Sequence, residues 1–255
     1  MDLMWCVLAA ALLPLFPASW LFNRAVARLP IGAAQGVAAL VLPQLGLALL
    51  RLAPAAAAWP HAARDGGMVV ATLSALLYAV RALSARDLGI WTRLVLSSGL
   101  ATIWLAWLAG TPFGALRVMA LGWGLPAAVA LVLAGVLVRR MGGAYIGLQG
   151  GLVAVMPRLT ASLVLAILAL TATPVFSPFF ALWKGLGAIP VAWLPFWLPL
   201  LFLWGWAAGR LFQDLLFGDY RGEKVADISG AGVAVIALVF VASVALSFVA
   251  NGGAL

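Results

Sequence analysis

Residues 159–184 read LTASLVLAILALTATPVFSPFFALWK, and this stretch decides the fold that we expect. It is an apolar run long enough to cross a bilayer, but Pro174 and Pro178 interrupt it and Lys184 follows. Proline removes a backbone donor and kinks or breaks a helix. The stretch therefore predicts a discontinuous membrane helix at 159–187, a feature that often marks an ion or substrate site in transporters. A kink that serves packing is the alternative.

The rest of the chain is equally apolar. Of its 255 residues, 66% are hydrophobic and 9% are charged, and the mean hydropathy is +1.15. A soluble domain usually carries about 25% charged residues. Such a chain cannot hide its side chains in one core, so the bilayer must serve as much of its solvent. We predict an all-α integral membrane protein with about eight transmembrane helices, at least one of them discontinuous, and no soluble domain.

Eight apolar runs support this count, at residues 3–22, 32–53, 66–83, 89–109, 114–138, 159–182, 190–217 and 228–250. The first run lacks a basic leading segment and a small-residue cleavage site, so we expect a retained helix rather than a signal peptide. Pro126 lies in the middle of the fifth run and predicts a kink there.

The net charge is +8, and the charged residues stand mainly between the apolar runs. This distribution is better explained by the orientation of the helices in the membrane than by nucleic-acid binding. Loops after even-numbered runs hold four basic residues: Arg51, Arg64, Arg117 and Lys184. Loops after odd-numbered runs hold eleven: Arg24, Arg28, Arg81, Arg86, Arg93, Arg139, Arg140, Arg158, Arg210, Arg221 and Lys224. The positive-inside rule then predicts a multi-pass protein of the cell inner membrane with both termini on the outer, periplasmic side.

The residues that usually carry catalysis or bind metals are scarce. Cys6 is the only cysteine and His61 the only histidine, so neither an internal disulfide nor a multi-histidine metal site is expected. No clustered set of histidines or carboxylates is present in the sequence. We therefore predict no catalytic residues, no metal site and no cofactor in this chain.

Three ionisable residues are candidates for a proton path: Lys184, Asp214 and Asp87. Ionisable groups inside a membrane are expensive and usually functional. Each also has a structural interpretation. Lys184 can extend to the interface from the end of its helix, Asp214 can pair with Arg210 one turn earlier, and Asp87 can flank an interfacial turn. One lysine and two carboxylates at helix ends make a poor proton wire, so a complete channel within this chain is not expected.

A series of short motifs from Asp87 onward adds a resemblance to this picture. The motifs, in order, are Asp87-Leu88 with Leu96-Ser97-Ser98-Gly99, residues 111–116, residues 124–140, Gly150-Gly151-Leu152 with Met156-Pro157, residues 174–180 and Phe217-Gly218. Their order and spacing resemble the second half of a proton-antiporter-like membrane subunit. That family includes the antiporter-like chains of respiratory complex I, their relatives in Mrp-type antiporters and membrane hydrogenases, and the membrane subunit of DAB-type inorganic-carbon uptake systems.

The resemblance covers about residues 75–250 and has clear departures. The family usually has ionisable residues at three positions that align with Gly89, Trp123 and Leu182, although Lys184 lies two residues beyond the last. The resemblance implies that residues 84–255 form about five antiporter-like helices. Residues 1–83 then form about three divergent helices in place of the first repeat.

The resemblance implies a shortened subunit of a multisubunit complex that is coupled to the proton motive force. The chain would contribute to or support proton translocation through a partner and would not be catalytic by itself. The expected partners are other membrane subunits, a soluble or peripheral catalytic subunit and lipids, but not nucleic acid. A polar loop at 219–224 is either a solvated turn or a docking site for a soluble partner. The alternatives are the membrane subunit of a DAB-like inorganic-carbon uptake system and a non-conducting scaffold.

Overall fold

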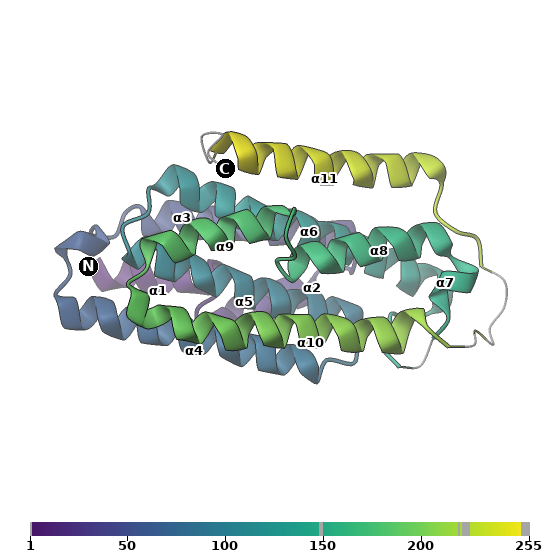
Figure 1. Cartoon of the computed structure of the whole chain (residues 1–255), viewed down its shortest axis with the longest axis horizontal. Coiled ribbons are helices and arrows are strands. Elements are labelled where there is room, and N and C mark those ends of the chain that lie inside the picture. The colour runs from purple at the N-terminus through teal and green to yellow at the C-terminus, as the bar shows by residue number, and fades with distance from the viewer. Residues whose placement is uncertain (1, 148–149, 219, 221–224, 251–255) are drawn as a thin grey trace.

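A computed structural model describes residues 2–147, 150–218, 220 and 225–250, and helices dominate it (Figure 1). The long helices are α3 (Ala33–Leu50), α4 (His61–Leu83), α5 (Leu88–Leu108), α6 (Phe113–Met141), α10 (Trp197–Leu216) and α11 (Gly230–Ala250). The shorter ones are α1 (Asp2–Leu12), α2 (Ser19–Arg28), α7 (Leu152–Val155), α8 (Pro157–Leu170) and α9 (Ser177–Ala188), with 3-10 turns η1 (Ala56–Ala58) and η2 (Val191–Phe196).

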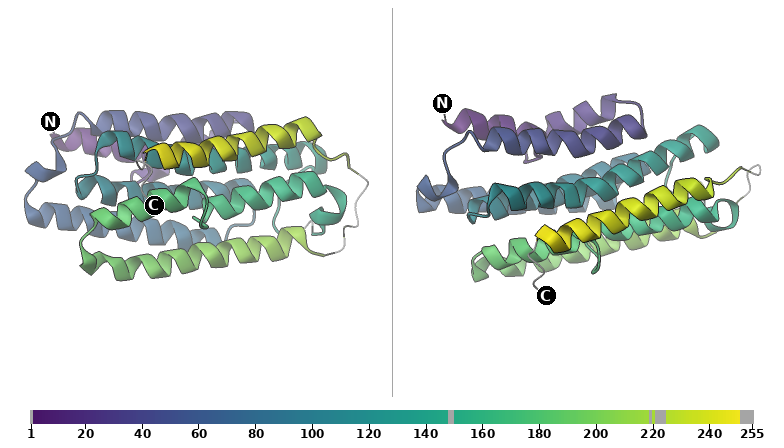
Figure 2. Two further views of the ribbon diagram at one scale, coloured as in Figure 1. Left: turned by 45° about the horizontal axis from the view of Figure 1, so that its top comes forward. Right: turned by 90° about the horizontal axis from the view of Figure 1, so that it is seen from above.

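The helices run along one common direction and form three layers. Viewed from above, α1–α3 lie on one side, α4–α6 in the middle and the later helices on the other side (Figure 2). α4 packs closely against α5, and α3 packs against α6. α5 is the centre of the bundle, because 89% of its membrane-length segment is buried within the protein.

The composition of the helices makes this a multi-pass membrane protein. Among the described residues, α3, α4, α5 and α6 are each long and apolar enough to cross a bilayer, and α8 and Gly230–Ala245 are shorter apolar helices. Large apolar side chains are exposed on the outer surface of the bundle, including Val37, Leu73, Leu198 and Val235. Such a surface suits lipid or a membrane partner rather than water.

The first apolar run differs from the single helix that we predicted at 3–22, because α1 and α2 are separate helices. The break contains two prolines, Pro14 and Pro17, and Pro17 has no N–H to offer the carbonyl of Leu13, its partner in a continuous helix. That carbonyl instead accepts from Trp104 Nε1 at 3.1 Å, and the N–H of Phe16 donates to Ser74 Oγ at 3.1 Å. The neighbouring helices therefore satisfy the backbone groups that the break releases.

The stretch predicted as a discontinuous helix contains two helices, α8 and α9, separated by residues 171–176. Pro174 lies in the break and cannot donate to the carbonyl of Leu170. Pro178 is the second residue of α9, a position where the missing N–H costs nothing. Ala172 and Val175 have positive φ angles of 53° and 90°, which side chains rarely adopt.

Glycines allow the close contact between α3 and α6. A Cβ on Gly36 would lie 3.2 Å from the carbonyl oxygen of Ala128, and one on Gly124 would lie 3.3 Å from that of Ala39. Small residues of this kind let membrane helices approach backbone to backbone. Pro126 lies within α6, which continues as a helix on both sides of it.

Candidate functional site

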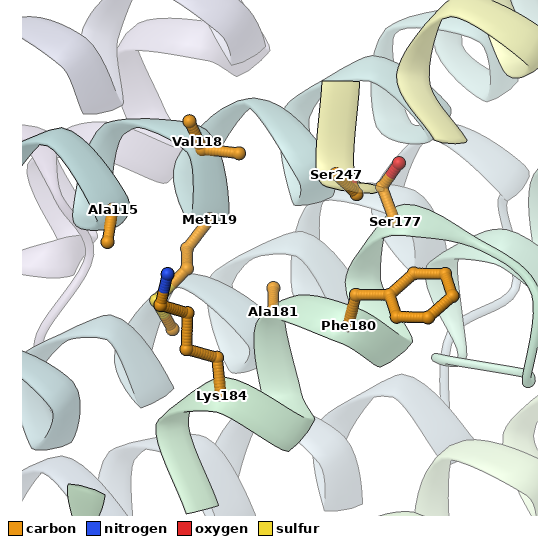
Figure 3. A pocket seen from close by; sticks show the side chains of 8 residues that line it. All are labelled: Ala115, Val118, Met119, Ser177, Phe180, Ala181, Lys184 and Ser247. Carbon is orange, nitrogen blue, oxygen red and sulfur yellow. The ribbon is translucent and has the colours of Figure 1, made fainter. Parts of the chain in front are cut away.

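Lys184 lies in the second half of the discontinuous helix and lines a small hollow between α9, α6 and α11. Its side chain is half-buried and extends from α9 toward Met119 and Ala115 of α6 (Figure 3). The cavity volume is about 10 Å³, roughly the room that one water molecule needs. The hollow therefore suits water or a proton and is too small for an organic substrate.

Asp87 caps the N-terminus of α5. Its carboxylate Oδ1 accepts from the N–H of Ile90 at 2.9 Å. The same turn is joined to the segment after α6, because Leu88 N donates to the Ala144 carbonyl and Ile146 N donates to the Arg86 carbonyl, each at 3.0 Å. A side-chain acceptor at this position satisfies one of the N–H groups that a helix start leaves unpaired. The structure thus gives Asp87 a local structural role.

Replacing Asp87 separates the structural role from a role in proton transfer. We expect Asp87→Ala to lower the free energy of unfolding by about 1 kcal/mol, whereas Asp87→Asn retains the cap. Asparagine cannot exchange a proton as a carboxyl group does. Thermal unfolding in detergent and proton-coupled turnover of the complex measure the two effects. Normal stability combined with lost turnover in Asp87→Asn would show that the carboxyl group takes part in proton transfer as well as in capping, and normal stability in Asp87→Ala would contradict the capping role.

Asp214 pairs with Arg210 as the i, i+4 spacing predicts, with Arg210 Nε 3.8 Å from Asp214 Oδ2. Both side chains are more than one third exposed, so the pair contributes little to stability. Arg210 also donates to the carbonyl of Leu83 at 2.6 Å and so joins α10 to the end of α4. This places Asp214 at the same end of the bundle as Asp87.

The three proton-path candidates are not brought together. Asp87 begins α5, which at 1.5 Å per residue extends about 31 Å to the opposite end. Lys184 lies beside Met119, two turns into α6, which starts from that opposite end. Lys184 is therefore roughly 20 Å from both carboxylates along the bundle. These groups do not form one continuous proton path.

The positions where the resemblance implies ionisable residues are occupied by buried groups that cannot titrate. Trp123 is fully buried and Leu182 is 3% exposed. Gly89 is buried as well, and a Cβ added there would lie 2.9 Å from Ile31 Cδ1. A longer side chain at Gly89 would therefore require its neighbours to move.

The structure also contains interior polar contacts that the sequence did not single out. Arg93 Nη1 donates to Gln35 Oε1 at 3.2 Å, and Asn23 Nδ2 donates to Ser97 Oγ at 3.1 Å. Each contact joins segments more than 50 residues apart. The available signal in the sequence was the presence of polar residues inside apolar runs. Among the described residues, no group of three or more His, Cys, Asp or Glu side chains is placed to bind a metal ion.

The solved structures that share this fold include the following two. The chain aligns with a chain of "Respiratory complex I from Thermus thermophilus with bound NADH" at a TM-score of 0.80 and 24% identity, covering 98% of this chain and 57% of that one. It aligns with a chain from "Structure of Mrp complex from Dietzia sp. DQ12-45-1b" at a TM-score of 0.76 and 16% identity, covering 96% and 55%. No protein-family model and no curated protein matches the sequence.

These likenesses confirm the predicted resemblance in fold to antiporter-like membrane subunits. The class of protein is therefore a multi-pass membrane chain with the fold of subunits from multisubunit membrane complexes. The chain spans somewhat more than half the length of each chain that it matches. The aligned share extends beyond residues 75–250, to nearly the whole sequence.

Proposed function

We propose that the chain is a shortened antiporter-like membrane subunit of a multisubunit complex coupled to the proton motive force, of the complex I type or a related kind. It supports proton translocation together with a partner and does not form a complete channel alone. The observation that carries this proposal is the discontinuous helix α8–α9, which places Lys184 beside a water-sized hollow. The distance from Lys184 to both candidate carboxylates favours a part of a path over a whole one.

The arrangement in the membrane and along the chain belongs to the same proposal. We place the protein in the cell inner membrane with eight spans and both termini on the periplasmic side, as the distribution of basic residues favours. Residues 1–83 take the place of a first repeat, and residues 84–255 form the antiporter-like part. Other membrane subunits, lipids and a peripheral catalytic subunit are the proposed partners. The polar loop proposed for docking lies mostly outside the described residues.

Replacing Lys184 tests the role in proton transfer. In the complex purified in mild detergent and reconstituted into vesicles, Lys184→Met is expected to lower proton-coupled turnover roughly 100-fold, as for the loss of a proton-transferring side chain. Lys184→Arg is expected to do the same, because arginine keeps its proton. Trp183→Ala, on the exposed side of the same helix, is the matched control.

The outcomes of this experiment distinguish a role of Lys184 in proton transfer from the function of a non-conducting scaffold. Full turnover in Lys184→Arg but not in Lys184→Met would mean that the charge matters and the proton transfer does not. Unchanged turnover in both would favour the non-conducting scaffold, which the buried apolar residues at positions 123 and 182 also favour. Neither comparison supports the inorganic-carbon alternative. Copurification of a soluble zinc-dependent protein with this chain would be the observation in its favour.

A further inference from the structure

Two clusters of polar side chains lie inside the bundle, on opposite sides of its middle. The first, which we call the α2–α5 cluster, contains Ser19, Asn23, Tyr78 and Ser97. The hydroxyls of Ser19 and Tyr78 are hydrogen-bonded to each other. Asn23 Nδ2 donates to Ser97 Oγ at 3.1 Å and to the carbonyl of Ser19 at 3.2 Å. This cluster joins α2, α4 and α5.

The second cluster lies beside the break in the discontinuous helix. It contains Ser177, Ser243 and Ser247, and we call it the α9–α11 cluster. The hydroxyls of Ser177 and Ser243 are hydrogen-bonded to each other, and Ser247 Oγ donates to the carbonyl of Ser243 at 3.0 Å. Ser177 and Ser247 also line the hollow that contains Lys184 (Figure 3).

Two pairs of consecutive residues, one pair on α5 and one on α6, connect the two clusters to a pair of tryptophans. Ser97 belongs to the α2–α5 cluster, and the next residue, Ser98, faces Trp204 of α10, whose Nε1 donates to Ser98 Oγ at 3.0 Å. On α6, a Cβ added to Gly122 would lie 3.4 Å from Ser177 Cβ, and the next residue is Trp123. The rings of Trp123 and Trp204 are 5.0 Å apart, edge to face.

The two indole rings are packed in the interior of the bundle. Trp123 and Trp204 each have no exposed surface. A Cβ on Gly99 would lie 2.4 Å from the Trp123 ring, so α5 is shaped to hold that ring. The Nε1 of Trp123 is buried and has no hydrogen-bond partner among the described residues. A buried polar atom would normally be hydrogen-bonded.

Hydroxyl groups and indole groups differ in one property that matters for protons. A hydroxyl both donates and accepts hydrogen bonds, so it can pass a proton along a chain of such bonds, whereas the indole N–H only donates. A proton that reaches Ser98 therefore meets the indole N–H of Trp204, which cannot accept it. We infer that Trp123 and Trp204 form a barrier between the α2–α5 and α9–α11 clusters, and that these two rings decide whether protons and water cross the bundle.

The barrier itself can be tested without any driving reaction. The inference rests on the proposed function only for the effect of the barrier on proton translocation in the complex. The complex is reconstituted into vesicles, a pH gradient is imposed, and the passive proton leak is followed with a fluorescent dye. Trp123→Ala is expected to raise the leak roughly tenfold or more, which corresponds to lowering the barrier by about 1.4 kcal/mol. Removing the ring leaves room for several waters, at about 30 Å³ each.

Two further variants separate the effect of the ring's volume on the leak from the effect of its hydrogen bonding. Trp123→Phe keeps an aromatic ring without a polar atom, and its leak is expected to stay at the wild-type level. Trp123→His keeps a ring that both donates and accepts, and its leak is expected to rise. The histidine variant also provides a test if Trp123→Ala fails to fold. A wild-type leak in every folded variant would overturn the inference.

Cysteine labelling gives an independent measurement of water access. In a Cys6→Ser background, Ser177→Cys is the only thiol in the chain. A water-soluble thiol reagent is expected to label it faster when Trp123 is alanine than when it is tryptophan, and equal rates would contradict the barrier. Neither measurement uses Lys184 or turnover, so a failed barrier leaves the result for Lys184 unaffected, and the reverse also holds.

Discussion

Trp204→Ala is expected to lower the free energy of unfolding by about 3–5 kcal/mol, the range for removing a buried tryptophan. The Trp204 ring has no exposed surface and lies edge to face against Trp123. Its removal leaves a cavity between α10 and the middle layer and takes away the donor to Ser98. Ser98 keeps its own bond to the carbonyl of Ala75 at 2.6 Å, so most of the loss comes from packing.

Trp206→Ala is the matched control for this variant. Trp206 lies on the same helix but is 55% exposed, so truncating it opens no cavity within the protein. Thermal unfolding of both variants in the same detergent measures the difference. Equal shifts in melting temperature would show that Trp204 does not stabilise the interior as its burial indicates.

Gly135→Ala is expected to lower the free energy of unfolding by about 1–3 kcal/mol, although alanine is normally the better helix former. A Cβ at this position would lie 2.6 Å from Gly32 Cα and 2.9 Å from the carbonyl oxygen of Ile31. Both atoms belong to the backbone of the turn between α2 and α3, so no side chain can rotate away. The extra methyl group must push α6 away from that turn.

Gly114→Ala provides the comparison on the same helix. A Cβ added to Gly114 meets nothing within 4 Å, so this change is expected to leave stability unchanged or raise it slightly. Unfolding by denaturant titration in detergent compares the two variants directly. A stability of Gly135→Ala equal to that of Gly114→Ala would contradict the close approach of α6 to the turn.

The sequence predicted the fold well because the strongest signals were local. Apolar runs bounded by charges and glycines located α3 to α6 within a few residues, and Pro174 located the break between α8 and α9. The first run was predicted as one helix because its apolar character is continuous across Pro17. The partners that hold that break open, Ser74 and Trp104, lie far along the chain and cannot be recognised from the run itself.

The candidate site was less predictable because its properties depend on long-range contacts. The i, i+4 spacing of Arg210 and Asp214 was enough to predict their pairing, since both lie on one helix. Nothing local shows that Lys184 lies far from Asp87, or that Trp123 meets Trp204. Side chains more than 80 residues apart in sequence meet there, and only the packing of α5, α6 and α10 brings them together.

The break between α1 and α2 has a consequence for how such sequences evolve. The prolines that interrupt the helix lie in one segment, while the groups that hydrogen-bond to the released backbone, the Ser74 hydroxyl and the Trp104 indole N–H, lie in two others. The information that specifies the break is therefore distributed over three helices. Substitutions at these positions are expected to occur together among related sequences. A search that examines one membrane segment at a time will overlook this dependence.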